Sequence, residues 1–248
     1  MLMEKNNVVR FEYAHLCCKT CDIRQVCPTN RASASSLAAK NTLYSRTLSR
    51  GDHLFRQGDA LKSLYVVRSG SVKTYISTRY GMDHVVKFYL PGELLGLDAL
   101  ANNHHASSAQ SLETSSVCRI AVDTGDGANR TSPLFQRQLL KLASQEMVGE
   151  HQRSVMLAQR DAGERLAVFL LELSQRYAKR GFSEREFNLS MSRQDIASLL
   201  ALAVETVSRL FTQFQASGLI SVDRRHICLL SPQGLRAMVG AERLRMAH

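Results

Sequence analysis

The stretch MSRQDIASLLALAVETVSRLFTQFQASGLI, residues 191–220, decides how the C-terminal part of this chain folds. Two short helices are predicted to meet at Ala201-Leu202-Ala203. Ser192 is expected to cap the first helix, with Asp195 three positions on, as in a capping box. Apolar residues recur at helical spacing, so we expect them to be buried. They are Ile196, Ala197, Leu199 and Leu200 in the first helix and Val204, Val207, Leu210, Phe211 and Phe214 in the second.

The remaining face of the second helix is polar and suits the major groove of DNA. Its residues are Glu205, Thr206, Ser208, Arg209 and Gln213. Arginine can bridge O6 and N7 of guanine, and glutamate can accept from N4 of cytosine. A helical hairpin with a merely solvated face fits the same pattern. The following ISVDRRHICLL favours DNA, because it predicts a hairpin tipped by Arg224, Arg225 and His226, a basic wing able to contact the backbone.

The overall charge agrees with a polyanionic partner. The 248 residues carry a net charge of +10, which suits nucleic acid or an anionic membrane surface. No apolar run approaches the ~20 residues of a membrane span, and the N-terminus lacks the pattern of a signal peptide. We therefore expect a cytoplasmic protein. The sequence has no P-loop, G-x-S-x-G, H-E-x-x-H or dinucleotide fingerprint, so we do not expect an enzyme.

Four of the six cysteines lie between residues 17 and 27. Cytoplasmic thiols stay reduced, so these residues are interpreted as metal ligands or redox groups. Cys18, Cys21 and Cys27 with the distant Cys118 suit an iron–sulfur cluster, which needs converging thiolates. Structural zinc and a metal-free thiol switch fit the spacing as well. Cys17 is a competing ligand, and Cys228 is expected to be a small packing residue.

The middle of the chain has strand character. Residues 61–78 alternate apolar and polar positions around Ser69-Gly70, as in a hairpin. Residues 84–96 supply another strand, ended by Pro91-Gly92, and residues 108–122 supply one or two more, with Cys118 at a strand end. Short strands at this spacing predict a small sandwich or barrel. Residues 124–132 are polar and contain glycine, so no regular structure is expected there.

A helix is predicted from Pro133 onwards, as a candidate dimer seam or a helix packed on its own domain. Its apolar positions are Leu139, Leu140, Leu142, Met147, Val148, Val155, Met156 and Leu157. Arg153 and Ser154 interrupt this stripe, which predicts a weak seam.

These segments together resemble the fumarate-and-nitrate-reduction branch of the cyclic-AMP-receptor superfamily of bacterial regulators. The resemblance rests on residues 191–220, with Glu205, Ser208 and Arg209 as its E-x-x-S-R reading motif, on RSGSVKTY, PGELLGLDAL and AQSLETSSVC, and on the four cysteines. It covers most of the chain. It implies an α+β fold: a cysteine-rich segment (1–30), a β-roll like that of cyclic-nucleotide-binding domains (31–132), a dimerisation helix (133–160) and a winged helix-turn-helix (161–248).

The same resemblance implies an oxygen-responsive regulator of anaerobic or microaerobic genes. Cys18, Cys21, Cys27 and Cys118 would hold a [4Fe-4S] cluster that favours a homodimer, and oxygen would release the DNA. The expected target is an inverted repeat of TTGAT-type half-sites, contacted by Glu205, Ser208 and Arg209 with Thr206 and Arg193. RNA polymerase is the further partner, for activation or repression.

Two departures from the family pattern carry their own expectations. Ala201 replaces the usual glycine of the turn, so the turn is predicted to avoid a positive φ there. PGELLG, residues 91–96, resembles the phosphate turn of a cyclic-nucleotide pocket, but no Arg or Lys lies between Gly96 and Glu113 to pair with the phosphate. We therefore predict no cyclic-nucleotide binding. His104 and His105 are expected to be solvated loop residues.

Overall fold

The computed structural model describes residues 19–24, 27, 45–79, 81–122 and 133–240. Segment 124–132 and Cys17 and Cys18 lie outside the described residues. The β domain contains β1 (Ser45–Leu48), β2 (His53–Phe55), β3 (Ser63–Ser69), β4 (Val72–Ser77), β5 (Asp83–Tyr89), β6 (Leu94–Leu95), a 3-10 turn (Leu97–Ala99), β7 (Ser108–Ser111) and β8 (Ser115–Ala121). The rest contains α4 (Pro133–Gln159), α5 (Ala162–Ala178), β9 (Glu186–Asn188), α6 (Arg193–Leu200), α7 (Val204–Ala216), β10 (Ile220–Asp223), β11 (His226–Leu229) and α8 (Pro232–Val239).

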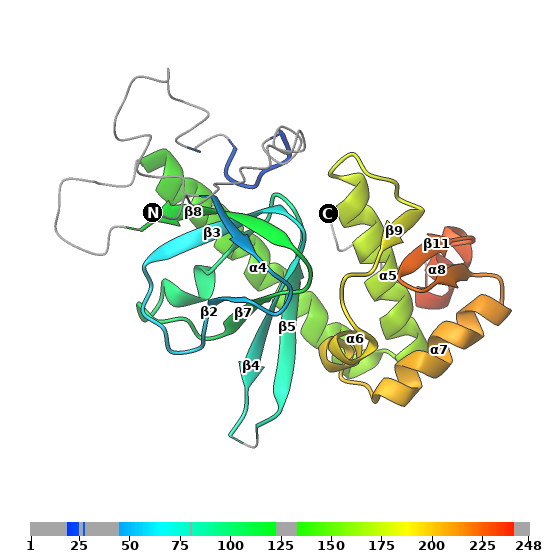
Figure 1. Ribbon diagram of the computed structural model, residues 1–248. Coiled ribbons are helices and arrows are strands. Elements are labelled where there is room, and N and C mark those ends of the chain that lie inside the picture. Colours follow the sequence, from blue (N-terminus) through cyan, green and yellow to red (C-terminus); the bar gives the residue numbers. More distant parts are fainter. Residues whose placement is uncertain (1–18, 25–26, 28–44, 80, 123–132, 241–248) are drawn as a thin grey trace, which may run out of the picture.

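The β domain is a roll of two four-stranded sheets (Figure 1). One sheet has the order β1-β8-β3-β6 and the other β2-β7-β4-β5. Val67 and Val72 belong to the apolar core of the roll. Leu64 packs in a cluster with residues of α4, and Phe88 packs with the core of the C-terminal domain. Residues 108–122 form two strands, β7 and β8, as one of the two expected outcomes.

The predicted hairpin at Ser69-Gly70 is wrong. Strands β3 and β4 both form, but they belong to different sheets, so the turn carries the chain from one layer to the other. Since β3 pairs with β8 on one side and β6 on the other, it has no free edge for β4. Gly70 has a φ of 74°, and a Cβ there would lie 2.3 Å from Oγ of Ser115, so the crossing requires glycine. The true hairpin of this region joins β4 to β5.

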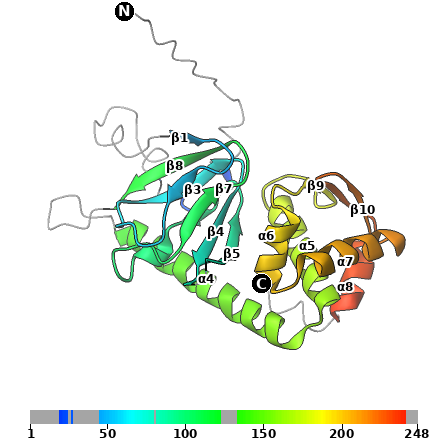
Figure 2. The same ribbon diagram turned by 60° about the horizontal axis from the view of Figure 1, so that its bottom comes forward.

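Helix α4 runs along the β-roll and leads to the C-terminal domain (Figure 2). Phe135, Leu142 and Met156 are its buried residues. The side chains on another face are exposed: Leu140 is 72% exposed, and Met147, Val148 and Val155 are each more than half exposed. At 3.6 residues per turn these four positions fall on one side of the helix. Part of the predicted seam is thus unpaired within the chain, whereas Leu142 and Met156 pack inward.

Arg153 does not interrupt this exposed stripe, contrary to the prediction. By helical geometry it lies on the side of α4 opposite Leu140. Its side chain is largely buried and forms an ion pair with Glu150. Ser154 lies at the edge of the stripe and donates its hydroxyl to the carbonyl of Glu150 at 3.0 Å. Arg153 therefore does not divide the apolar stripe, although the same geometry places two exposed polar residues, Ser144 and His151, on it.

The C-terminal domain packs α5, α6, α7 and α8 with the three-stranded sheet β10-β11-β9 around one apolar core. Helix α5 begins with a full capping box between Asp161 and Glu164 and is buried along Leu166, Leu170 and Leu173. None of the helices in the described part of the chain combines the length and the hydropathy that a membrane span requires. The α+β fold and winged helix-turn-helix predicted from sequence are confirmed.

Candidate DNA interface and cysteine site

The first helix of the helix-turn-helix is fixed at its start as predicted. Oγ of Ser192 accepts from the backbone N–H of Asp195 at 3.1 Å, and the Asp195 carboxylate accepts from the N–H of Ser192 at 2.9 Å. This capping box satisfies two N–H groups that a helix end leaves unpaired. Ile196, Ala197 and Leu200 are buried behind it.

The turn between α6 and α7 differs from the prediction at Ala201. This residue has φ 52° and ψ 51°, the left-handed conformation that was expected to be avoided. The helix ends there because the N–H groups of Ala201 and Leu202 reach back to the carbonyls of Ser198 and Ala197, at 3.4 and 2.9 Å. These bonds impose the positive φ on whichever residue occupies the position.

We expect Ala201→Gly to stabilise the protein. An L-residue in the left-handed region costs ~1–2 kcal/mol, while glycine gives back part of the gain as unfolded-state entropy. The net effect should be about 1 kcal/mol, or about 2–4 °C in melting temperature. Calorimetry of both proteins measures it. Ala216→Gly, at the last residue of α7, is the control: that residue is helical rather than left-handed, so glycine should bring no gain. A lower melting temperature for Ala201→Gly would show that the turn gains nothing from glycine.

Helix α7 separates an apolar and a polar face almost as predicted. Val207, Leu210, Phe211 and Phe214 are buried. Val204, expected among them, is 36% exposed because it lies at the helix start, beyond the core. Glu205, Ser208, Arg209 and Gln213 are exposed, and Thr206 is half-buried. The predicted reading residues therefore share an accessible face near the helix N-terminus, the position that enters the major groove in this class of motif.

Arg193 lies beneath this face rather than on it. Its guanidinium carbon is 3.2 Å from the centroid of the Phe211 ring, a cation–π contact. Burial lowers the pKa of Arg193. This stacking joins the start of α6 to α7, so Arg193 supports the packing of the two helices whether or not it also contacts DNA.

The wing forms as predicted. Strands β10 and β11 pair antiparallel from Ile220 with Leu229 to Asp223 with His226. Arg224 and Arg225 make the tip, and both are exposed. Arg224 has a φ of 55°, a conformation that tight hairpin turns demand. The wing lies in the same domain as α7 (Figure 1), so this domain carries two exposed guanidinium groups besides the polar face of α7.

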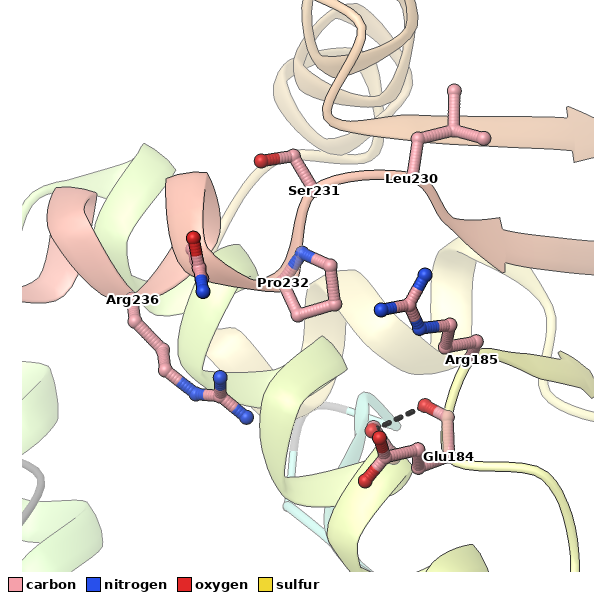
Figure 3. A pocket seen from close by; sticks show the side chains of 8 residues that line it. Glu184, Arg185, Leu230, Ser231, Pro232 and Arg236 are labelled. Carbon is pink, nitrogen blue, oxygen red and sulfur yellow. Dashed lines mark hydrogen bonds between the residues drawn. The ribbon is translucent and has the colours of Figure 1, made fainter.

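A small hollow lies at the opposite end of β11 from the wing tip. Figure 3 shows the side chains of Arg185 and Arg236 on either side of Pro232, with Glu184 close to Arg185. The hydroxyl of Ser174 donates to the carbonyl of Glu184 at 2.5 Å at its edge. Because of its place, this hollow is not part of the exposed face that α7 and the wing present.

Three of the four predicted cysteine ligands are described, and all three pack against one apolar cluster. Cys21 and Cys27 come from the N-terminal loop and Cys118 from β8. The cluster also contains Ile23, Ile120 and, from α4, Phe135 and Leu142. Cys118 lies in the middle of β8 rather than at its end, opposite Val66 of β3 and Ser45 of β1. The cysteines at positions 21, 27 and 118 thus border the same apolar cluster, to which the start of α4 also contributes.

The chemistry of these side chains fits an iron–sulfur cluster. Each is partly buried and in apolar surroundings, and thiolates are the usual ligands of such clusters. Among the described residues, no group of three or more His, Cys, Asp or Glu is already arranged around a metal position. Cys18, the fourth predicted ligand, lies outside them. The fit therefore rests on the kind of donor and on their common surroundings.

The loop carrying Cys21 is held on the roll by the turn at residues 91–95. The N–H of Asp22 donates to the carbonyl of Gly92 at 2.9 Å, and the N–H of Leu94 donates to the Asp22 carboxylate at 3.1 Å. Burial, with the nearby Glu93, raises the pKa of Asp22. Gln138 of α4 donates to the carbonyl of Asp22 at 2.6 Å. The same loop thus touches both the roll and α4.

The segment that follows PGELLG, residues 97–107, contains neutral and acidic side chains that bind one another. The backbone N–H and hydroxyl of Ser107 donate to Asp98 at 3.0 and 2.8 Å. His105 is 3% exposed and stacks on Phe55 with centroids 3.6 Å apart. The prediction of a solvated His105 is therefore wrong, because a ring fifty residues earlier covers it. His104 is exposed, as expected.

Sequence reasoning missed the side chains that join the two domains. Glu93 of the roll pairs with Arg176 of α5 at 2.6 Å and with Arg180, just after α5, at 2.7 Å. Lys73 of β4 pairs with Asp195 at 2.6 Å. No local pattern signals these pairs, since their members are about 80 to 120 residues apart. The one available sign was Asp195 itself: its Oδ2 caps α6, which leaves Oδ1 for the pair with Lys73.

A β-roll joined by a long helix to a winged helix-turn-helix defines a class: DNA-binding transcription regulators, not enzymes. Comparison with known proteins agrees. The profile of the Crp-like helix-turn-helix domain matches residues 164–238, and that of the cyclic nucleotide-binding domain matches residues 45–124. The chain is 40% identical to the fumarate and nitrate reduction regulatory proteins of Salmonella typhi and Escherichia coli K12, over 91% of each chain. It is 39% identical to that of Yersinia pestis, over 99% of this chain and 100% of the relative.

The chain belongs to the family of fumarate and nitrate reduction regulatory proteins. Solved structures support the fold. FixK2 from Bradyrhizobium japonicum is 26% identical with a TM-score of 0.72, over 79% of this chain and 96% of its own. A CRP-family regulator from Thermus thermophilus is 19% identical with a TM-score of 0.64, over 79% and 96%.

Proposed function

We propose that this regulator answers oxygen through a [4Fe-4S] cluster held by Cys18, Cys21, Cys27 and Cys118, and controls genes of anaerobic or microaerobic life in the cytoplasm. The observation that carries the proposal is the meeting of Cys21, Cys27 and Cys118 on one apolar cluster with α4 residues. The family it belongs to, named for fumarate and nitrate reduction, supports it. When bound, the cluster would supply the reactivity toward oxygen.

The chain's own residues would turn a change at the cysteines into a change at α4. Phe135 and Leu142 of α4 share the apolar cluster with the cysteines, and Gln138 binds the carbonyl of Asp22. Farther along, Lys87 of β5 pairs with Glu146 of α4 at 2.5 Å. A shift of the cysteine loop would therefore displace the first turns of α4. The other face of this helix is exposed.

That exposed face is proposed to form the homodimer. Leu140, Met147, Val148 and Val155 repeat at intervals of seven and eight residues, close to the seven-residue repeat of a two-helix seam. Two-fold symmetry would then place the two α7 helices about one DNA turn, ~34 Å, apart on an inverted repeat of TTGAT-type half-sites. RNA polymerase is the further partner proposed.

Leu140→Glu is expected to keep the protein monomeric. Like charges facing each other across a two-fold seam cost several kcal/mol, so dimerisation should weaken by about a hundredfold or more. The fold should persist because this side chain is 72% exposed. Sedimentation of anaerobic protein measures the change. Gln145→Glu, which adds the same charge outside the stripe, should dimerise normally; an unaltered dimer in Leu140→Glu would place the seam elsewhere.

On DNA, Arg209 is proposed to bridge a guanine, Glu205 to accept from a cytosine and Ser208 to contact a base or phosphate. Ser208 now donates to the carbonyl of Val204 at 3.0 Å, and rotation of its hydroxyl would free it. Thr206 and Arg193 remain proposed contacts. Cyclic-nucleotide binding is not proposed. A cyclic phosphate would need a cationic side chain in the segment after Gly96, and this segment instead carries Asp98 bound to Ser107.

Iron and acid-labile sulfide analysis of protein purified without oxygen tests the proposal. We expect both elements in comparable amounts, with a broad visible absorption that bleaches in air. A colourless protein containing zinc would instead support a structural site, and a metal-free protein would support a thiol switch. Either result would contradict the oxygen-sensing proposal while leaving the family assignment intact.

A further inference from the structure

The turn at residues 91–95 is contacted from two sides. On one side lies the cysteine loop, residues 19–24 of the described chain. Besides the two hydrogen bonds of Asp22, its backbone lies against Gly92: a Cβ on Gly92 would lie 3.0 Å from the carbonyl oxygen of Thr20 and 3.5 Å from Cα of Cys21. Gly92 has a φ of 93°. The turn therefore cannot move without disturbing the loop, and the reverse holds as well.

On the other side, the turn holds helix α5 of the DNA-binding domain. The Glu93 carboxylate accepts two bonds from Arg176, at 3.0 and 2.6 Å, and one from Arg180 at 2.7 Å. Arg180 also donates to the carbonyl of Pro91 at 2.5 Å, and Arg176 donates to the carbonyl of Phe88 at 2.5 Å. Arg176, in the last turn of α5, and Arg180, just after the helix end, are thus bound to a single short segment of the roll.

Glu93 is well suited to hold this contact. Its side chain is 13% exposed, and its carboxylate also accepts from the N–H of Leu90 at 2.9 Å, which fixes it on its own turn. Burial would raise the pKa of Glu93, but Arg176 and Arg180 outweigh that effect and hold the pKa below its usual value. Charge-assisted, two-pronged bonds of this kind are strong and directional, and breaking one partner of a buried pair leaves charge uncompensated.

We propose that Glu93 is a positioning residue: it sets the orientation of the DNA-binding domain on the roll according to the place of the cysteine loop, within one subunit. Helix α5 packs against α6 and α7, so a displaced α5 moves the reading face. This route adds to the change in dimerisation proposed above. The inference rests on the proposed function in one respect only: loss of the cluster is taken as the event that moves the loop.

Hydrogen exchange of the full chain at the C-terminal end of α5, residues 176–182, tests the inference. In cluster-loaded wild-type protein this segment should be protected, and its exchange should speed up about tenfold or more after air, since local opening reports the lost contact. In Glu93→Gln it should exchange fast in both states, with a difference under about twofold. Arg180→Gln, which leaves Arg176 paired, should fall between and serves if Glu93→Gln fails to fold.

Lys73→Gln is the matched control. It breaks the other ion pair between the domains, with Asp195, but leaves the 91–95 turn intact, so the response to air at residues 176–182 should stay as in wild type. A full response in both Glu93→Gln and Arg180→Gln would overturn the inference. So would a wild-type segment that stays unchanged while DNA binding responds to air.

A further variant separates this inference from the oxygen-sensing proposal. Asp22→Ala removes the acceptor of the Leu94 N–H and so loosens the loop from the turn without any cofactor. In protein purified without oxygen and not exposed to air, it should speed exchange at residues 176–182 relative to the wild type prepared alike. If no cluster is found but Asp22→Ala still has this effect, the oxygen-sensing proposal fails and the coupling stands. If exchange at α5 is unchanged, the coupling fails whatever the cofactor.

Discussion

Cys118→Ser protein purified without oxygen is expected to contain neither the acid-labile sulfide nor the visible absorption of an iron–sulfur cluster. Cys118 is the predicted ligand on a strand, held in mid-β8 between β1 and β3, whereas the others lie on the N-terminal loop. A serine hydroxyl is a poor substitute for a thiolate at iron. Without the thiolate of Cys118, the cysteines of the N-terminal segment would lack the ligand that the β-roll supplies to the cluster.

The fold itself should survive this change. Serine is close to cysteine in size, and Cys118 is only partly buried. Compared with wild-type protein, both freed of metal, the melting temperature should differ by a few degrees at most, about the effect of one half-buried group. Cys228→Ser is the matched control: Cys228 also lies in mid-strand and is partly buried, but in the wing. It should keep iron and sulfide. Full iron and sulfide in Cys118→Ser would point to Cys17 or to another ligand.

Arg209→Ala is expected to weaken binding to the cognate repeat by roughly 5- to 150-fold, the ~1–3 kcal/mol of one bidentate base contact. The preference for the contacted guanine should also relax. Arg209 is exposed on α7, so the melting temperature should not change. Binding titrations against the repeat and against single-base variants of each half-site measure both effects.

Arg224→Ala at the wing tip is the comparison for Arg209→Ala. A backbone contact carries no sequence information, so this variant should weaken binding to all sequences alike and reduce the salt dependence by about one phosphate contact. An Arg209→Ala protein that loses affinity uniformly and keeps its half-site preference would show that Arg209 binds a phosphate rather than a base.

The parts predicted correctly from the sequence are those that local patterns specify. The capping box of Ser192 and Asp195, the buried stripe of α7 and the tip at Arg224 each depend on residues within a few positions of one another. The reading face follows from the same periodicity, because the positions that are not buried are the ones left for DNA. Val204, exposed at the helix start, and Thr206, half-buried, depart from this pattern.

The errors arise where distant residues decide. Strand β3 pairs with β8 and β6 instead of β4, although its alternation fits a hairpin equally well. His105 is buried because Phe55 covers it. Ala201 is the exception among the errors, because its positive φ is imposed locally by the end of α6. Glu93 was interpreted only as part of a nucleotide-type turn; its partners lie more than eighty residues on. Local patterns do not encode such pairings, and they are also what joins the cysteine loop to the DNA-binding domain.

In the proposed function, DNA binding by residues 205–209 depends on a cluster held by the cysteines at 18, 21, 27 and 118. One measurement tests this dependence most directly. Wild-type protein prepared without oxygen is titrated onto a duplex carrying the inverted repeat, and the titration is repeated after brief exposure to air, with iron and sulfide measured in both samples. We predict tight binding by cluster-containing protein, and a fall in affinity that tracks the loss of the cluster. Equal affinity before and after the cluster is lost would contradict the proposed function.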